Sequence, residues 1–137
     1  MIEVAVRGRP DVDPAPLVAR LIWTCERLGV AEAEVGLMVV EPAEMAAING
    51  EHRDRPESTD VLSFPVDGPE ALDWPEGGPV PELGDVIICP ESAEEPLTTL
   101  VVHGVLHLLG YDHEADEGQM LALQDRLVDE ADAERVT

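Results

Sequence analysis

Apolar and polar residues alternate at the start of the chain, and the spacing then becomes helical. Residues 2–7 (Ile-Glu-Val-Ala-Val-Arg) follow the two-residue period of a half-buried strand. After Asp13 and Pro14, a pair typical of a helix start, apolar side chains recur at helical spacing as far as Gly29. We therefore predict a first strand followed by an amphipathic helix that ends at Gly29.

The middle of the chain repeats this order of strand and helix. Residues 34–40 form a more apolar run that predicts a second strand, and Pro42 opens a helical pattern that continues to His52. A polar turn over residues 53–59 then leads to a third predicted strand at residues 60–65. A second strand, a second helix and a third strand are thus expected in the first half.

The second half of the chain contains one long irregular segment and three further elements. Residues 66–82 are rich in proline, glycine and acidic side chains, which predicts an exposed loop or a loose hairpin. Residues 83–89 predict a fourth strand, followed by a helix from about 96 to 109 and a last helix from about 114 to 134. Four strands and four helices favour an α+β or mixed α/β architecture in which helices cover one sheet.

The candidate chemistry lies in the helix at 96–109 and in the turn that follows it. His103 and His107 are four residues apart, so a helix places them on one face, where both can reach one ion. Gly110 can adopt the left-handed conformation that ends a helix, which would bring His113 to the same point. Three neutral imidazoles with a fourth position open to water describe a catalytic zinc site. A helix packed on the sheet would present these rings in a cleft at the sheet's edge.

The same spacing occurs in the metzincin metalloproteases, whose pattern is H-E-x-x-H-x-x-G-x-x-H. The glutamate of that pattern, the general base of peptide hydrolysis, is replaced here by Gly104. A chain that keeps the metal spacing without this base is not expected to be a peptidase. A single histidine on an apolar helix is usually an ordinary core residue. That alternative explains three histidines at this spacing less well.

Composition limits the classes of protein that remain. A chain of 137 residues with 45% hydrophobic residues is sufficient for a single domain with one core. No apolar segment approaches the roughly 20 residues that span a bilayer, and the amino terminus leads directly into Ile2-Glu3-Val4 without the basic and apolar regions of a signal peptide. We therefore expect a cytoplasmic protein without a membrane partner. Cys25 and Cys89 are far apart and are expected to be reduced core residues.

The net charge of −22 argues against tight, non-specific binding to nucleic acid. Eight basic residues, all arginine, oppose thirty acidic ones, whereas phosphate neutralisation usually supplies much of the affinity for RNA or DNA. Residues 67–95 contain nine acidic residues and no basic one, while Arg53 and Arg55 lie close together. A local basic pocket is compatible with this distribution, and most of the carboxylates are expected to form a solvated acidic surface.

Several segments of the chain together resemble the YbeY family of bacterial metal-dependent endoribonucleases. Residues 103–113 (His-Gly-Val-Leu-His-Leu-Leu-Gly-Tyr-Asp-His) match the family signature H-G-x-L-H-L-x-G-Y-D-H. Residues 59–65 resemble the family segment T-[DN]-V-L-S-F, and residues 83–88 resemble L-G-D-I-x-I. Upstream, Asn49 and Arg53 match the asparagine and the functional arginine of the family.

The resemblance implies a fold, an activity and a set of partners. The family's fold is a mixed four-stranded sheet with helices, so we predict a single α+β domain over residues 1–137. The implied activity is that of a zinc-dependent endoribonuclease that cleaves single-stranded RNA. The family is linked to maturation of the 3′ end of small-subunit rRNA and to ribosome quality control. Precursor rRNA and the ribosome or its proteins are therefore the expected partners, and DNA is not.

The candidate metal ligands and the candidate catalytic residue follow from the motif and from the resemblance. The three histidines are the expected ligands of one zinc ion, although nickel, copper and cobalt also suit imidazole. The resemblance implies that Arg53 is catalytic, since its guanidinium can bridge two phosphate oxygens and offset developing negative charge. The sequence alone leaves open that Arg53 is a surface arginine paired with Asp54 or Glu57.

Asp85 and Asp112 are candidates for orienting the ligands, since a metal-bound histidine usually donates its other ring proton to a carboxylate or a carbonyl. Asp85 can equally shape the start of the fourth strand, and Asp112 can help the turn between two ligands. With Gly104 in the position of the protease base, the residue that takes the proton stays unassigned. Water and the RNA 2′-hydroxyl both remain candidate nucleophiles.

The chain also departs from the family pattern. Only residues 90–99 separate the fourth strand from the apolar run that carries the histidines, where relatives usually have a longer helical approach with charged residues. Two other functions stay open: a non-catalytic ribosome-assembly factor stabilised by its metal, and a small zinc hydrolase or peptidase. The acidic composition suits the first through basic ribosomal proteins, and Gly104 speaks against a peptidase.

Overall fold

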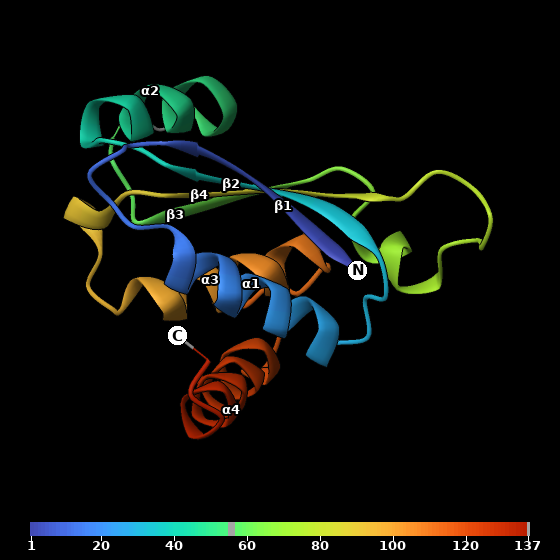
Figure 1. The fold of residues 1–137 in the computed structure, drawn as a ribbon. Helices are drawn as coiled ribbons and strands as arrows, with labels where there is room; N and C mark the ends of the chain where they lie inside the picture. Colours follow the sequence, from blue (N-terminus) through green and yellow to red (C-terminus); the bar gives the residue numbers. More distant parts are fainter. Residues whose placement is uncertain (55–56, 137) are drawn as a thin grey trace.

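The predicted strands form one sheet in the order β1-β2-β4-β3 (Figure 1). In the computed structural model, which describes residues 1–54 and 57–136, the strands are β1 (Ile2–Gly8), β2 (Ala33–Val39), β3 (Val61–Pro65) and β4 (Glu82–Ile88). Arg55, in the predicted polar turn, lies outside these described residues. β2 pairs in parallel with both β1 and β4, whereas β3 pairs antiparallel with β4. The predicted mixed four-stranded sheet is confirmed, with β1 and β3 at its edges.

The helices cover the two faces of the sheet unequally (Figure 1). α1 (Ala15–Arg27) and α3 (Leu97–Leu108) pack on one face, α4 (Gln119–Ala133) lies beyond them, and α2 (Pro42–Arg53) lies over the other face. Two short 3-10 helices, η1 (Gly68–Asp73) and η2 (Pro90–Ser92), lie in the connections before and after β4. No helix in the described ranges has both the length and the apolar character needed to cross a bilayer. This arrangement places α3 between the sheet and α4.

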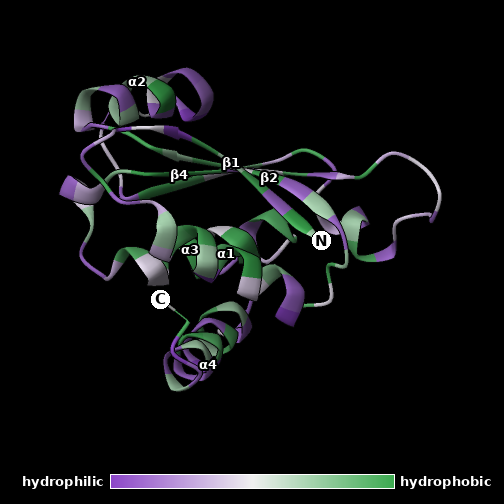
Figure 2. Ribbon diagram, in the orientation of Figure 1, coloured by the Kyte–Doolittle hydropathy of each residue, from purple (hydrophilic) through white to green (hydrophobic). Residues whose placement is uncertain are grey.

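The apolar faces that the sequence pattern predicts meet between the sheet and the α1–α3 layer. Val35, Leu37 and Val39 of β2 are buried in this core, as the two-residue period of a strand requires. α3 is buried on most sides, in agreement with its nearly continuous apolar sequence and its central position (Figure 2). A separate cluster joins α3 to α4 and includes Val102, Leu106, Met120 and Leu127. The helix that carries two of the histidines is therefore held from both sides.

Two segments differ from the predicted elements. The segment at 66–82, expected to be a loop or a hairpin, contains η1. The last helix begins later than predicted, at Gln119, because the carboxylate of Asp116 accepts hydrogen bonds from the backbone N–H groups of Gly118 and Met120. Gly118 has a φ of +98°, which glycine adopts readily but which interrupts a right-handed helix. The turn before α4 thus replaces the first part of the expected helix.

Both cysteines are buried and free, which confirms the prediction of reduced core residues. Burial raises the pKa of the Cys25 thiol to about 12, because the thiolate form is poorly solvated in the core. At neutral pH Cys25 is therefore protonated and unreactive.

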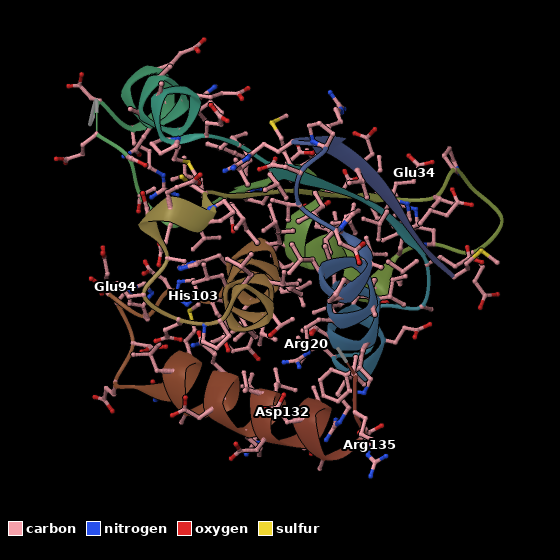
Figure 3. All side chains as sticks on the ribbon, turned by 60° about the vertical axis from the view of Figure 1, so that its left-hand side comes forward. Arg20, Glu34, Glu94, His103, Asp132 and Arg135 are labelled. Atoms are coloured by element: carbon pink, nitrogen blue, oxygen red, sulfur yellow. The ribbon has the colours of Figure 1, made fainter. Side chains whose placement is uncertain are left out.

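A buried arginine ties the end of α4 to α1. Arg20 of α1 is 3% exposed, and its guanidinium lies 2.9 Å from the carboxylate of Asp132 (Figure 3). The same guanidinium donates hydrogen bonds to the carbonyl oxygen of Val136. The carboxy-terminal half of α4 is thus anchored without any contribution from the histidines.

Candidate metal centre

Two histidines lie one turn apart on α3. The ring centroids of His103 and His107 are 4.7 Å apart, and their Nε2 atoms approach to 3.2 Å. Both side chains are half-buried, in contrast to the fully buried apolar residues on much of the helix. The helical spacing therefore brings two ring nitrogens together, as the sequence predicts.

The turn after α3 brings the third histidine to the other two. Gly110 has a φ of +96°, the left-handed conformation that was predicted to end the helix, and its N–H donates to the carbonyl oxygen of His107. The ring centroid of His113 then lies 5.1 Å from that of His103 and 5.2 Å from that of His107. A single glycine conformation thus closes the cluster.

The three rings fit a single metal ion. One nitrogen atom from each histidine lies within 4.8 Å of the corresponding atoms of the other two. In a tetrahedral site with metal–nitrogen bonds of about 2.0–2.1 Å, two ligand nitrogens are roughly 3.3 Å apart. The observed 3.2 Å between the Nε2 atoms of His103 and His107 is close to this value. Nδ1 of His113 is buried without a hydrogen-bond partner among the described residues, so the cluster also contains an unsatisfied polar atom.

Burial favours the form of these rings that binds metal. It lowers the pKa of His107 below the ordinary 6.5, because the charged imidazolium is poorly solvated there, and the neighbouring His103 and His113 lower it further. His107 consequently stays neutral to a more acidic pH than a solvent-exposed histidine does. The neutral ring has the free lone pair that metal coordination requires.

Gln124, a residue that the sequence analysis did not select, contacts this cluster. It lies on α4, is 6% exposed, and its Oε1 atom is 2.7 Å from Nδ1 of His103. The sequence feature that could have identified Gln124 is its place on the apolar face of the helix, between the buried Met120 and Leu127. A polar side chain at such a position requires a hydrogen-bond partner.

Asp85 and Asp112, the two candidates for orienting the histidines, form their contacts elsewhere. Asp85 is exposed on the face of β4 that points away from α3, because successive strand residues face opposite sides and its neighbour Val86 packs against α3. Asp112 lines the cleft beside the cluster, but its Oδ1 atom accepts a hydrogen bond from the backbone N–H of Glu114. Across the described parts of the chain, neither carboxylate forms a hydrogen bond with a ring nitrogen of the cluster. Asp112 therefore acts as a turn residue, the alternative that the sequence left open.

Arg53, the last residue of α2, lines the same cleft as His107 and His113. The cleft has a volume of about 340 Å³ and lies between the edge strand β3, which contributes Ser63, and the turn that carries His113. Within residues 1–54 and 57–136, the guanidinium of Arg53 forms no ion pair with a carboxylate, its acidic neighbours included. Two of the three histidines, His107 and His113, thus line a cleft at the sheet's edge, and a cation lines its wall.

Asn49 stabilises the connection that follows Arg53. Its side chain is 4% exposed, and its amide Nδ2 donates a hydrogen bond of 3.0 Å to the carbonyl oxygen of Glu57. This bond ties the last turn of α2 to the segment that leads into β3. The asparagine of the matched motif therefore helps to place the arginine.

Gly104 lies on the face of α3 that packs against the sheet. A Cβ atom at this position would come within 2.7 Å of Cγ1 of Val86 and within 3.2 Å of Oγ of Ser63. The hydroxyl of Ser63 also donates a hydrogen bond of 3.1 Å to the carbonyl oxygen of Gly104. The position that carries the base in the metzincin pattern is therefore a point of close contact between α3 and the sheet, with no room for a side chain.

Known proteins resemble this chain over nearly its whole length. Residues 17–132 match the family model described as endoribonuclease YbeY. The proteins named endoribonuclease YbeY of Mycobacterium tuberculosis and Mycobacterium marinum are each 41% identical to it, over 98% of this chain and 85% of the relative. These alignments extend over 152 positions, more than the 137 residues present here, so the relatives carry residues that this chain lacks. The solution structure of TM1509 from Thermotoga maritima matches with a TM-score of 0.60 and 25% identity, over 98% of this chain and 91% of that one.

Proposed function

The chain belongs to the YbeY family of endoribonucleases, and from this premise we propose that residues 1–137 form one metal-dependent domain that cleaves single-stranded RNA. We further propose that its role is in 3′-end maturation of small-subunit rRNA and in ribosome quality control, as the resemblance to the family implies. The observation that carries the proposal is that two histidines of the three-histidine cluster and Arg53 line one cleft.

Zinc is the proposed ion, held by His103, His107 and His113. Three neutral nitrogen ligands leave one position of a tetrahedral ion open, which is typical of catalytic rather than structural zinc. When bound, such an ion supplies Lewis-acid chemistry at a phosphoryl oxygen and activates water at neutral pH. The chain contributes the placement of the three rings and, through the lowered pKa of His107, the neutral form that binds.

Arg53 is the proposed electrostatic partner of the scissile phosphate. A guanidinium is planar and can donate two parallel hydrogen bonds to phosphate oxygens. Its position on the wall of the cleft, beside two of the histidines, suits a phosphate bound between the cation and the metal. Charge that develops on the phosphate in the transition state would then be offset from both sides.

Peptide hydrolysis suits this site less well than RNA cleavage. The position of the protease base is Gly104, whose hydrogen atoms face the packed sheet. RNA provides an internal nucleophile in its 2′-hydroxyl, whereas a peptide bond provides none. A substrate that brings its own nucleophile is therefore better matched to these residues.

The acidic surface favours an RNA that a partner presents. With a net charge of −22, the protein repels free polyanions over most of its surface. Basic ribosomal proteins would meet a complementary surface, and rRNA held on the ribosome would not depend on capture by this chain alone. We therefore propose the ribosome, or one of its proteins, as the partner that delivers the substrate.

The substitution Arg53→Ala tests the proposed function. It should leave zinc binding intact and reduce RNA cleavage by about 10²–10³-fold, the loss typical when one donor to transition-state charge is removed. The measurement is the rate of cleavage of a labelled single-stranded RNA by protein loaded with one equivalent of zinc. The zinc content of each preparation is determined in parallel.

Arg126→Ala is the matched control, because Arg126 is an exposed arginine of α4 outside the cleft. This variant should cleave at the wild-type rate, and chelation of the metal should stop cleavage by both proteins. Full activity of Arg53→Ala would remove Arg53 from the reaction. If no zinc-loaded preparation cleaved RNA, the result would favour the non-catalytic assembly factor.

A further inference from the structure

Gln124 reaches the metal cluster from a different helix. In Figure 3, His103 lies above the amino-terminal half of α4, the half that contains Gln124. The side chain of Gln124 is 6% exposed, and its Oε1 atom is 2.7 Å from Nδ1 of His103. Gln124 is buried and His103 is half-buried, so water competes less for this hydrogen bond than it would at the surface.

We propose that Gln124 is a positioning residue that fixes the tautomer and the ring orientation of His103 for metal binding, an inference that rests on the proposed metal site. Nε2 of His103 faces Nε2 of His107 at 3.2 Å, so Nε2 is the atom that would coordinate the ion. A coordinating Nε2 carries no proton, and the proton of the neutral ring then resides on Nδ1. The Nδ1–H group donates to Oε1 of Gln124, which favours this tautomer over the one that cannot bind metal.

The acceptor in this position is a neutral amide. A carboxylate would make His103 more basic and would hold the metal more tightly. An amide orients the ring equally well but compensates less of the positive charge of the ion. The choice of glutamine therefore favours a strongly Lewis-acidic ion over maximal metal retention.

The packing of α4 does not depend on this hydrogen bond. Met120 and Leu127 pack against α3 through apolar contacts, and Arg20 holds the far end of the helix. An apolar side chain at position 124 can join the same cluster. Loss of the hydrogen bond can consequently be separated from loss of the fold.

The test measures zinc affinity and the stability of the metal-free protein separately. Gln124→Leu removes the acceptor and should weaken zinc binding roughly 10- to 100-fold, measured by competition with a chromophoric chelator. The thermal midpoint of its metal-free form should stay close to that of the wild type, because the added apolar burial offsets the loss of one hydrogen-bond partner at the half-buried ring of His103. Gln124→Glu restores an acceptor and should bind zinc at least as tightly as the wild type.

Gln119→Leu is the matched control: Gln119 is exposed at the start of α4, its Oε1 atom accepts a hydrogen bond from the backbone N–H of Glu117 rather than from the cluster, and its loss should leave zinc affinity at the wild-type value. Equal zinc affinity of Gln124→Leu and the wild type would overturn the inference and leave the metal site intact. A parallel loss of affinity and of metal-free stability would overturn it as well, because Gln124 would then be a structural residue only. If the wild type itself bound no zinc, the proposed function would fail and this inference with it.

Discussion

The variant His107→Ala should lose both zinc binding and RNA cleavage. The ring of His107 is adjacent to both other ligands, with centroid distances of 4.7 Å to His103 and 5.2 Å to His113. Its removal leaves two ring nitrogens, which hold a divalent ion much more weakly than three. Loss of a hydrogen-bond partner of a ligand already weakens metal binding roughly 10- to 100-fold, so loss of a ligand should exceed about 100-fold. Cleavage of single-stranded RNA should then fall to background.

His52→Ala is the matched control for this experiment. His52 lies outside the cluster and packs against Phe64, with ring centroids 5.0 Å apart, so this variant should retain one zinc ion. The metal-free form of His107→Ala should stay folded, because the half-buried His107 lines the cleft rather than the apolar core. Equal cleavage by His107→Ala and the wild type would assign the activity to a contaminant. One tightly bound zinc in the variant would contradict the assignment of His107 as a ligand.

The metal cluster could be predicted from the sequence because its geometry is local. One helical turn brings His103 and His107 together, and the left-handed conformation of Gly110 brings in His113. The strands could also be predicted, since their alternation is local. The sheet order β1-β2-β4-β3 could not, because it depends on pairing between segments far apart in the chain.

Contacts between distant segments account for what the sequence pattern missed. Gln124 and His103 come from different helices, and no local spacing links them. The position of Asp85 depends on which face of β4 is covered, which the sequence left open between a place beside the histidines and a role at the start of the strand. Val86 is fully buried, so the two-residue period of β4 sends Asp85 to the opposite face. A strand residue should therefore be assigned to a site only after its face is known.

The short approach to the metal helix does not weaken its packing. In the described structure, the connection from β4 to α3 contains the 3-10 helix η2 and little else. α3 is nevertheless covered by α1, the sheet and α4. The packing of the metal helix thus depends on these neighbours.

The variant Gly104→Glu, which would supply the metzincin base, should unfold the protein instead. A Cβ atom at position 104 would meet Cγ1 of Val86 at 2.7 Å and Oγ of Ser63 at 3.2 Å, so the glutamate would have to push α3 away from β3 and β4. Overpacking of a core typically costs about 1–3 kcal/mol, and burial of an unpaired carboxylate adds several kcal/mol more. This sum is comparable with the total stability of about 5–15 kcal/mol that a domain of this kind has.

Urea unfolding followed by circular dichroism measures this loss, with Gly78→Glu as the matched control. A Cβ atom at Gly78 would meet nothing within 4 Å, so that variant should unfold at the wild-type midpoint. Gly104→Ala isolates the steric part. Overpacking should lower its free energy of unfolding by about 1–3 kcal/mol, and the better helix propensity of alanine should restore about 1 kcal/mol of that loss. A stable Gly104→Glu protein would contradict the close packing and would favour peptide hydrolysis again. Unfolding of Gly104→Glu would instead show that in this fold α3 can pack on the sheet or carry the protease base, but not both.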